Sequence, residues 1–163
     1  MIELDIARLN LTSPYFVTQD EEGDLLFVTD SGIRYAISFD FNDGMMNYPA
    51  YEFGILNKDD QPSPQDRKLR DTVLAIIEEF FHSNGGVLLY ICATGDGMQK
   101  FRFRLFLRWF NTYEYRELYE LRAIEDVMDD DTPNYGAIIV EKSHPDLELI
   151  LDRFDELAAF LKK

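Results

Sequence analysis

A row of basic residues near the middle of the sequence carries its most distinctive chemistry. Lys100, Arg104 and Arg108 recur every four residues, and positions 98–111 contain no acidic residue. On a helix this spacing places the three side chains on one face, where ammonium and guanidinium groups bind phosphate or carboxylate oxygens. Long cationic side chains also cover apolar surface and pair with acids inside a fold. The row therefore indicates either an anion-binding site or a structural helix.

A glycine-containing loop precedes this row and extends the candidate site. Residues 94–97 follow an apolar run and stand directly before the predicted helix, a position in which free backbone N–H groups hold anions. The loop has neither the Gly-Lys-Ser/Thr nor the GxGxxG pattern of nucleotide-binding loops. A turn in which Asp96 caps the helix, with Gln99 reaching back, explains it equally well. The candidate ligand-binding residues are Thr94, Gly95, Asp96, Gly97, Lys100, Arg104 and Arg108.

Motifs for catalysis or metal binding are absent from the sequence. The single cysteine, Cys92, lies in an apolar run and is predicted to be a buried thiol, and the two histidines have no metal-ligand spacing. Asp129–Asp131 lack the alternation of a calcium loop, and Glu78 and Glu79 are predicted to be solvated on a helix. We therefore expect no catalytic residues, no metal and no cofactor, and we favour a non-enzymatic protein over an enzyme.

The elements that would position these residues begin with a meander of strands. Residues 15–18, 25–29, 33–40 and 51–55 have β-type or alternating apolar patterns, separated by polar turns that contain glycine. Residues 2–9 alternate as well and are expected to add an edge strand. The first third of the chain is therefore predicted to be an antiparallel meander.

Helices enter after this meander. A helix is predicted over 64–83, with Ser63 as its N-cap and Asn84-Gly85-Gly86 as its end. A buried strand over 87–93 and a largely buried helix over 98–111 follow. On that helix Phe101, Leu105 and Trp109 lie opposite the basic row, and the apolar face is widened by Phe103, Phe106, Leu107 and Phe110. Residues 113–124 fit a strand or a helix, with the strand preferred. An acidic loop over 125–131, a strand over 135–141 and a final helix complete the order.

The fold class that this order predicts is α+β. We expect an N-terminal antiparallel meander and a mainly antiparallel sheet, with about three helices packed on it. The length of 163 residues suits a single domain over 1–163. No apolar stretch is long enough to span a bilayer and the N-terminus does not resemble a signal peptide, so a cytoplasmic location without membrane contact is expected.

The charge of the chain bears on its partners. The formal net charge is −15, with net −9 over residues 1–60, +2 over 61–110 and −8 over 111–163. An overall field of this sign repels nucleic acid, so nucleic acid is not an expected partner. Two acidic flanks favour encounter with a basic protein, and a homodimer through a free sheet edge is a further hypothesis.

Several short strings resemble a family of short, uncharacterised bacterial proteins. Those in the first third are Tyr15-Phe16-x-Thr18, Thr29-Asp30-x-Gly32-x-x-Tyr35 and Tyr51-x-Phe53, and the central ones are residues 88–92, 95–97 and 104–110. The family is a domain of unknown function, found mostly in gut-type anaerobes, and the resemblance covers roughly residues 14–142. It implies no activity, substrate or cofactor. It implies only that the strand–loop–helix block around residue 96 is its centre.

Three classes of function remain open from the sequence. The first is a non-enzymatic protein-interaction or regulatory module with a basic partner, and this is the one we favour. The second is a binder of an anionic small ligand or a nucleic-acid end through residues 94–108. The third is an enzyme with an active site that matches no motif and uses Tyr90, Asp96 or Arg104.

Overall fold

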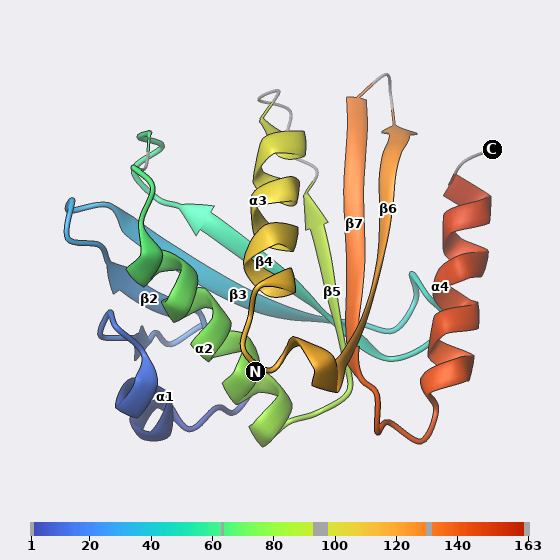
Figure 1. The fold of residues 1–163 in the computed structure, drawn as a ribbon, viewed down its shortest axis with the longest axis horizontal. Coiled ribbons are helices and arrows are strands. Elements are labelled where there is room, and N and C mark those ends of the chain that lie inside the picture. Colours follow the sequence, from blue (N-terminus) through green and yellow to red (C-terminus); the bar gives the residue numbers. More distant parts are fainter. Residues whose placement is uncertain (1, 63, 93–97, 130–131, 162–163) are drawn as a thin grey trace. The chain divides into compact units, whose positions relative to one another are not determined.

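The chain forms an α+β arrangement in which four consecutive strands, β1 to β4, precede most of the helices (Figure 1). The computed structural model describes residues 2–62, 64–92, 98–129 and 132–161. These residues form seven strands in a mostly antiparallel arrangement, four α-helices and one short 3-10 helix. The predicted fold class is confirmed, with one helix more than expected. Among the described residues, no helix is both long and apolar enough to cross a membrane.

The chain divides into two compact units that each draw on separate stretches of sequence. Unit 1 comprises residues 1–40 and 53–85, and unit 2 comprises residues 41–52 and 86–163. Strands β3 (Arg34–Asn42) and β4 (Ala50–Asn57) pass from one unit into the other. The expectation that residues 1–163 are one domain stays a prediction.

Unit 1 contains the N-terminal meander. Strand β1 (Thr18–Gln19) pairs antiparallel with β2 (Leu25–Val28), and β2 pairs antiparallel with β3. The predicted edge strand over residues 2–9 is wrong, because Ile6–Thr12 form helix α1. The Asp5 carboxylate accepts a hydrogen bond from the Arg8 amide at 3.0 Å, and this N-terminal cap favours a helix over the extended alternative.

Helix α2 (Arg67–Ser83) starts later than its sequence pattern predicted. Its N-cap is Asp66 and not Ser63, since the Asp66 carboxylate accepts from the amides of Lys68 and Leu69 at 2.9 and 3.2 Å. Pro64 therefore precedes the helix. The end of the helix is as predicted: Asn84 is the C-cap, and Gly85 and Gly86 follow with positive φ of 69° and 90°, a conformation that glycine adopts without strain.

The core of unit 1 lies between α2 and the meander. The Phe80 ring stacks on Phe39 of β3 at a centroid distance of 5.2 Å, and Phe39 also contacts Phe53 of β4 at 5.4 Å. The Thr72 hydroxyl, fully buried on α2, accepts from the Tyr15 amide at 3.2 Å. The buried face of α2 is thus covered by residues that precede it in the chain.

Unit 2 is built around three strands in the order β5-β7-β6. Strand β5 (Val87–Cys92) pairs antiparallel with β7 (Thr132–Glu141), and β7 pairs antiparallel with β6 (Tyr119–Asp129). The strand prediction for 113–124 holds from Tyr119 onwards, after the 3-10 helix Arg116–Leu118. The predicted loop over 125–131 is wrong for most of its length, because β6 continues to Asp129 and is paired with β7 across a register shift between Ile124 and Val127.

Two helices cover opposite faces of this three-stranded group. The rings of Phe103 and Phe106 on α3 (Gln99–Asn111) contact Tyr90 of β5 at 6.1 and 4.3 Å. Helix α4 (Leu147–Leu161) buries Ile150 and Phe154 in a cluster with Val87, Leu89, Ile138 and Val140. Because successive strand residues point to opposite faces, Val87 and Leu89 face away from Tyr90. Helices α3 and α4 therefore pack on opposite sides.

Candidate functional site

The three predicted cations of the candidate site lie on the exposed side of α3. Lys100, Arg104 and Arg108 are all exposed, as expected for residues that share a helix face away from the sheet. Arg104 is 3.9 Å from the carboxylate of Glu125, whereas Lys100 and Arg108 form no ion pair within the described part of the chain. None of the three side chains is therefore buried, whereas Arg104 does pair with an acid from another element.

The buried face of α3 agrees with only part of the predicted apolar face. Its buried residues are Gln99, Phe103, Phe106 and Phe110. Phe101, which the sequence placed on the apolar face, is 60% exposed, and Met98 is 49% exposed. The reason is that α3 carries apolar residues almost all the way round, so that only packing against β5 and β7 decides which ones are covered.

The structure describes only part of the candidate site. Thr94, Gly95, Asp96 and Gly97 lie outside the described residues. Helix α3 begins at Gln99, with Met98 as its N-cap residue, and the prediction that Asp96 caps it falls on a residue outside the described ones. The structure therefore brings together three of the seven predicted residues, all of them on one helix.

Beneath α3, the side chains of β5 offer no reactive group to solvent. Cys92 is buried, as predicted, and Tyr90 is buried between α3 and the strand. Burial, followed by the neighbouring Cys92, raises the pKa of the Tyr90 hydroxyl. Because Tyr90 keeps its proton and is covered by the aromatic rings of α3, it does not contact a substrate and acts as a packing residue.

Unit 1 contains a buried ion pair that the sequence does not predict. Glu79, predicted to be solvated, is only 5% exposed, and its carboxylate accepts from Arg8 Nη2 and Nε at 2.6 and 2.9 Å. It also accepts from the Ser83 hydroxyl and from the Asp5 amide. Burial opposes the charged form, but the hydrogen bonds from Arg8, Ser83 and Asp5 outweigh it and hold the pKa of Glu79 below its usual value. This arrangement joins α1 to α2.

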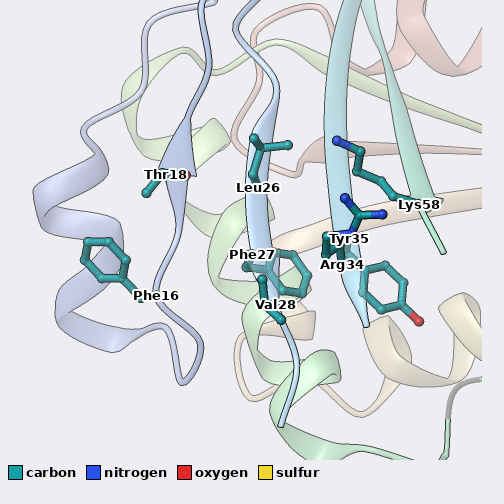
Figure 2. A pocket seen from close by; sticks show the side chains of 8 residues that line it. All are labelled: Phe16, Thr18, Leu26, Phe27, Val28, Arg34, Tyr35 and Lys58. Atoms are coloured by element: carbon teal, nitrogen blue, oxygen red, sulfur yellow. The ribbon is translucent and has the colours of Figure 1, made fainter. Parts of the chain in front are cut away.

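A shallow hollow of about 420 Å³ lies on the outer side of the meander (Figure 2). Phe16, Leu26 and Val28 give it an apolar floor, and Arg34 and Lys58 lie at one side of it. The Arg34 guanidinium is held by Asp59 at 2.6 Å. None of the seven predicted site residues lines the hollow, and its lining includes no nucleophile paired with a base.

The turn between β1 and β2 contains a group of three carboxylates, where the sequence predicts only a polar turn. Oxygen atoms of Asp20, Glu22 and Asp24 lie within 4.8 Å of one another. The Asp20 carboxylate accepts from the amides of Glu22 and Asp24 at 3.0 and 2.9 Å, which closes the turn. Burial and the charges of Asp20 and Glu22 raise the pKa of Asp24. Of the three carboxylates, Asp20 therefore has a structural role in closing this turn.

A row of carboxylates runs along the outer face of α4. Glu148, Asp152 and Glu156 recur every four residues and are exposed, on the side of the helix opposite the buried Ile150 and Phe154. Glu156 is 3.5 Å from Arg153, while Glu148 and Asp152 have no ion pair among the residues that the structure places. We call these three residues the acidic row, and Lys100, Arg104 and Arg108 the basic row.

Comparison with known proteins identifies a family but no activity. No curated protein and no solved structure matches the sequence significantly. A family model described as a family of unknown function (DUF6169) matches residues 65–156. This range contains α2, the central strings 88–92, 95–97 and 104–110, and both charged rows, whereas the strings before residue 54 lie outside it. Because the match covers more than half of the sequence, the chain belongs to the DUF6169 family of unknown function.

Proposed function

We propose that the protein is a non-enzymatic protein-interaction module that binds a basic partner. The observation that carries the proposal is the acidic row on α4, where Glu148 and Asp152 are exposed and lack an ion pair within the described residues. A row of carboxylates at one helix spacing is complementary to a basic surface, and it lies in a region with net charge −8. A cytoplasmic location belongs to the same proposal, supported by a single buried cysteine that needs no oxidising compartment.

Capture from a lysate of the source cells, treated with nuclease, tests this proposal. Three baits are compared: the wild type, Glu148→Lys with Asp152→Lys on the acidic row, and Glu114→Lys with Asp43→Lys as the control. The control changes two other exposed carboxylates of unit 2 by the same charge. We expect the wild type and the control to retain the same basic protein at low salt, and the acidic-row variant to lose it.

High salt should release that protein from both baits, because exposed charges are screened. Circular dichroism of the three baits verifies that all of them are folded. A wild-type bait that retains no specific protein contradicts the proposal. So does a protein retained equally by all three baits, or one that high salt does not release.

The basic row supports a second function, the binding of an anionic ligand. Its three cations are exposed, and Lys100 and Arg108 have no ion pair within the described residues. Inorganic pyrophosphate is a suitable probe for isothermal titration calorimetry. We expect heat of binding with the wild type and none with Arg104→Glu plus Arg108→Glu, a variant that stays folded because both side chains are exposed. Absence of binding to the wild type rules this function out.

A further inference from the structure

The basic row and the acidic row of unit 2 have the same spacing along their helices and opposite charges. Glu148, Asp152 and Glu156 on α4 have the same four-residue spacing as Lys100, Arg104 and Arg108 on α3. Four residues advance a helix by about 6 Å, so successive charges of either row are separated by the same distance along the helix axis. Two helices laid side by side would therefore bring all three pairs of opposite charges together.

The rows of one molecule cannot meet each other. Helix α3 packs on the face of β5 and β7 that carries Tyr90 and Tyr135, and α4 packs on the face that carries Val87 and Val140. Both rows point away from the sheet, so they lie on opposite sides of unit 2. Any contact between them is a contact between two copies of the chain.

We propose that the basic partner of the acidic row is the basic row of a second copy of this chain. The inference rests on the proposed function, for which it names the partner. Asp152 and Arg104 are the middle members of their rows, so they face each other whether the two helices run parallel or antiparallel. Such a contact joins different surfaces of the two copies, and contacts of this kind build rings or open chains rather than simple twofold dimers.

Exposed apolar side chains beside both rows support the contact. Phe101 on α3 is 60% exposed, and Phe160 and Leu149 on α4 are 73% and 43% exposed. Ala159 is exposed on the same side of α4 as Asp152, and its small side chain lets another helix come close. Burial of this apolar surface adds an attraction that salt does not screen, and thereby opposes the repulsion between two chains of net charge −15.

Sedimentation velocity of the full chain tests the inference through two charge reversals. In Asp152→Arg, both rows are positive at their centre, and in Arg104→Asp both are negative. We expect the wild type to form larger species as its concentration rises at low salt, and each variant alone to associate about tenfold more weakly. In an equal mixture, every contact between unlike variants has opposite charges at its centre, so the mixture should associate again.

Matched controls separate this contact from a general effect of charge. Glu114→Arg and Lys142→Asp change the net charge by the same amounts at exposed positions on neither helix, and both should associate like the wild type. Three results overturn the inference: a wild type that is monomeric at every concentration, controls that associate as weakly as the row variants, or a mixture that fails to associate.

The two proposals fail in distinguishable ways. Suppose that the wild type is monomeric, that its bait retains a basic protein other than this chain, and that the Glu148→Lys plus Asp152→Lys bait does not. The inference about a second copy is then wrong, while the proposed interaction module stands. If the wild type associates through neither row and its bait retains no protein, both are wrong. Capture of the chain's own untagged copies, lost on reversal of either row, supports both.

Discussion

At the scale of single residues, the clearest difference between expectation and structure is Glu79. The sequence offers two adjacent glutamates on one helix, and nothing in their spacing distinguishes a solvated carboxylate from a buried one. The difference arises from Arg8, which is 71 positions earlier and whose guanidinium reaches Glu79 from α1. A pairing over such a distance has no local signature, because it depends on how α1 and α2 pack.

Replacement of Glu79 by Gln should destabilise the fold. The change removes the charged partner of Arg8 but keeps a hydrogen-bonding side chain, and Arg8 is partly exposed and recovers some hydration. We expect the free energy of unfolding in urea to fall by about 1–2 kcal/mol at neutral pH. Glu114→Gln, at an exposed position, should change it by less than about 0.5 kcal/mol. Equal effects of the two substitutions would contradict the buried ion pair.

The same pair predicts a dependence on pH. The pKa of Glu79 is lower in the folded chain than its usual value of 4.5, so the unfolded chain binds the proton first as the pH falls. The stabilisation is complete above that value and is lost as the pH falls through the lowered folded pKa. The unfolding free energies of the wild type and Glu79→Gln in urea should therefore converge as the pH falls below 4.5. A difference that stays constant from neutral to acidic pH would show that the charge is not involved.

Tyr15 predicts the opposite dependence in alkali. Its hydroxyl donates to Asp66 and accepts from the Asp30 amide at 3.2 Å, and burial, together with the bond to Asp66, raises the pKa of Tyr15 to about 12. The unfolded chain loses this proton first, near pH 10, so stability falls between pH 10 and 12. Tyr15→Phe should lack this component of the decline. Identical alkaline unfolding curves for the two proteins would refute the raised pKa.

At the scale of elements, the helices that follow the meander were easier to predict than the faces they bury, whereas α1 was expected to be a strand. The apolar period of α2 and its terminal glycines define a helix unambiguously, and the structure differs only at the start, where the Asp66 carboxylate forms the cap. In α3 the apolar residues extend round the helix, so the period fixes the element but not its orientation. Strand β6 is the opposite case, because its acidic composition predicts a loop at its end. Pairing with β7 makes that end a strand.

Two phenylalanines of α3 allow a direct test of its orientation. Phe103 is fully buried and its ring lies 5.5 Å from that of Tyr135, whereas Phe101 is mostly exposed. Phe103→Ala should lower the free energy of unfolding by about 3–5 kcal/mol, because it leaves a cavity in the core. Phe101→Ala should lower it by less than about 1 kcal/mol. Thermal or urea unfolding of the two variants checks this. A larger loss of stability in Phe101→Ala than in Phe103→Ala would contradict the orientation of α3 described here.

At the scale of the whole molecule, composition and element order predicted the fold class but not the division into units. The boundaries cross β3 and β4 and fall between Gly85 and Gly86, so each unit combines stretches that are distant in sequence. The candidate site was predicted in part. The basic row is visible in the sequence because its spacing is local, whereas the acidic row can be identified as an exposed surface only once the buried side of α4 is known.

This division predicts the behaviour of a shortened chain. A fragment over residues 65–163 contains the whole family match but lacks Phe39, Tyr15 and Asp5, which cover α2 in the full chain. The apolar face of α2 would then be exposed to water. We expect this fragment to bind the dye ANS and to unfold without a sharp thermal transition, unlike the full chain. A cooperative transition in the fragment would show that its part of the structure is self-sufficient.

The membership of Met46, Tyr48 and Ala50 in unit 2 has a consequence for the order of events during synthesis. Met46 and Ala50 are buried with Ile150 and Phe154, and the Tyr48 hydroxyl donates to Asp146 at 3.0 Å, 98 positions later. A ribosome produces the early segment first and at 5–20 residues per second, so residues 41–52 wait for several seconds before their partners exist. Contacts of such long range also close slowly. The nascent chain therefore exposes this apolar stretch, a target for chaperones, until its last helix has emerged.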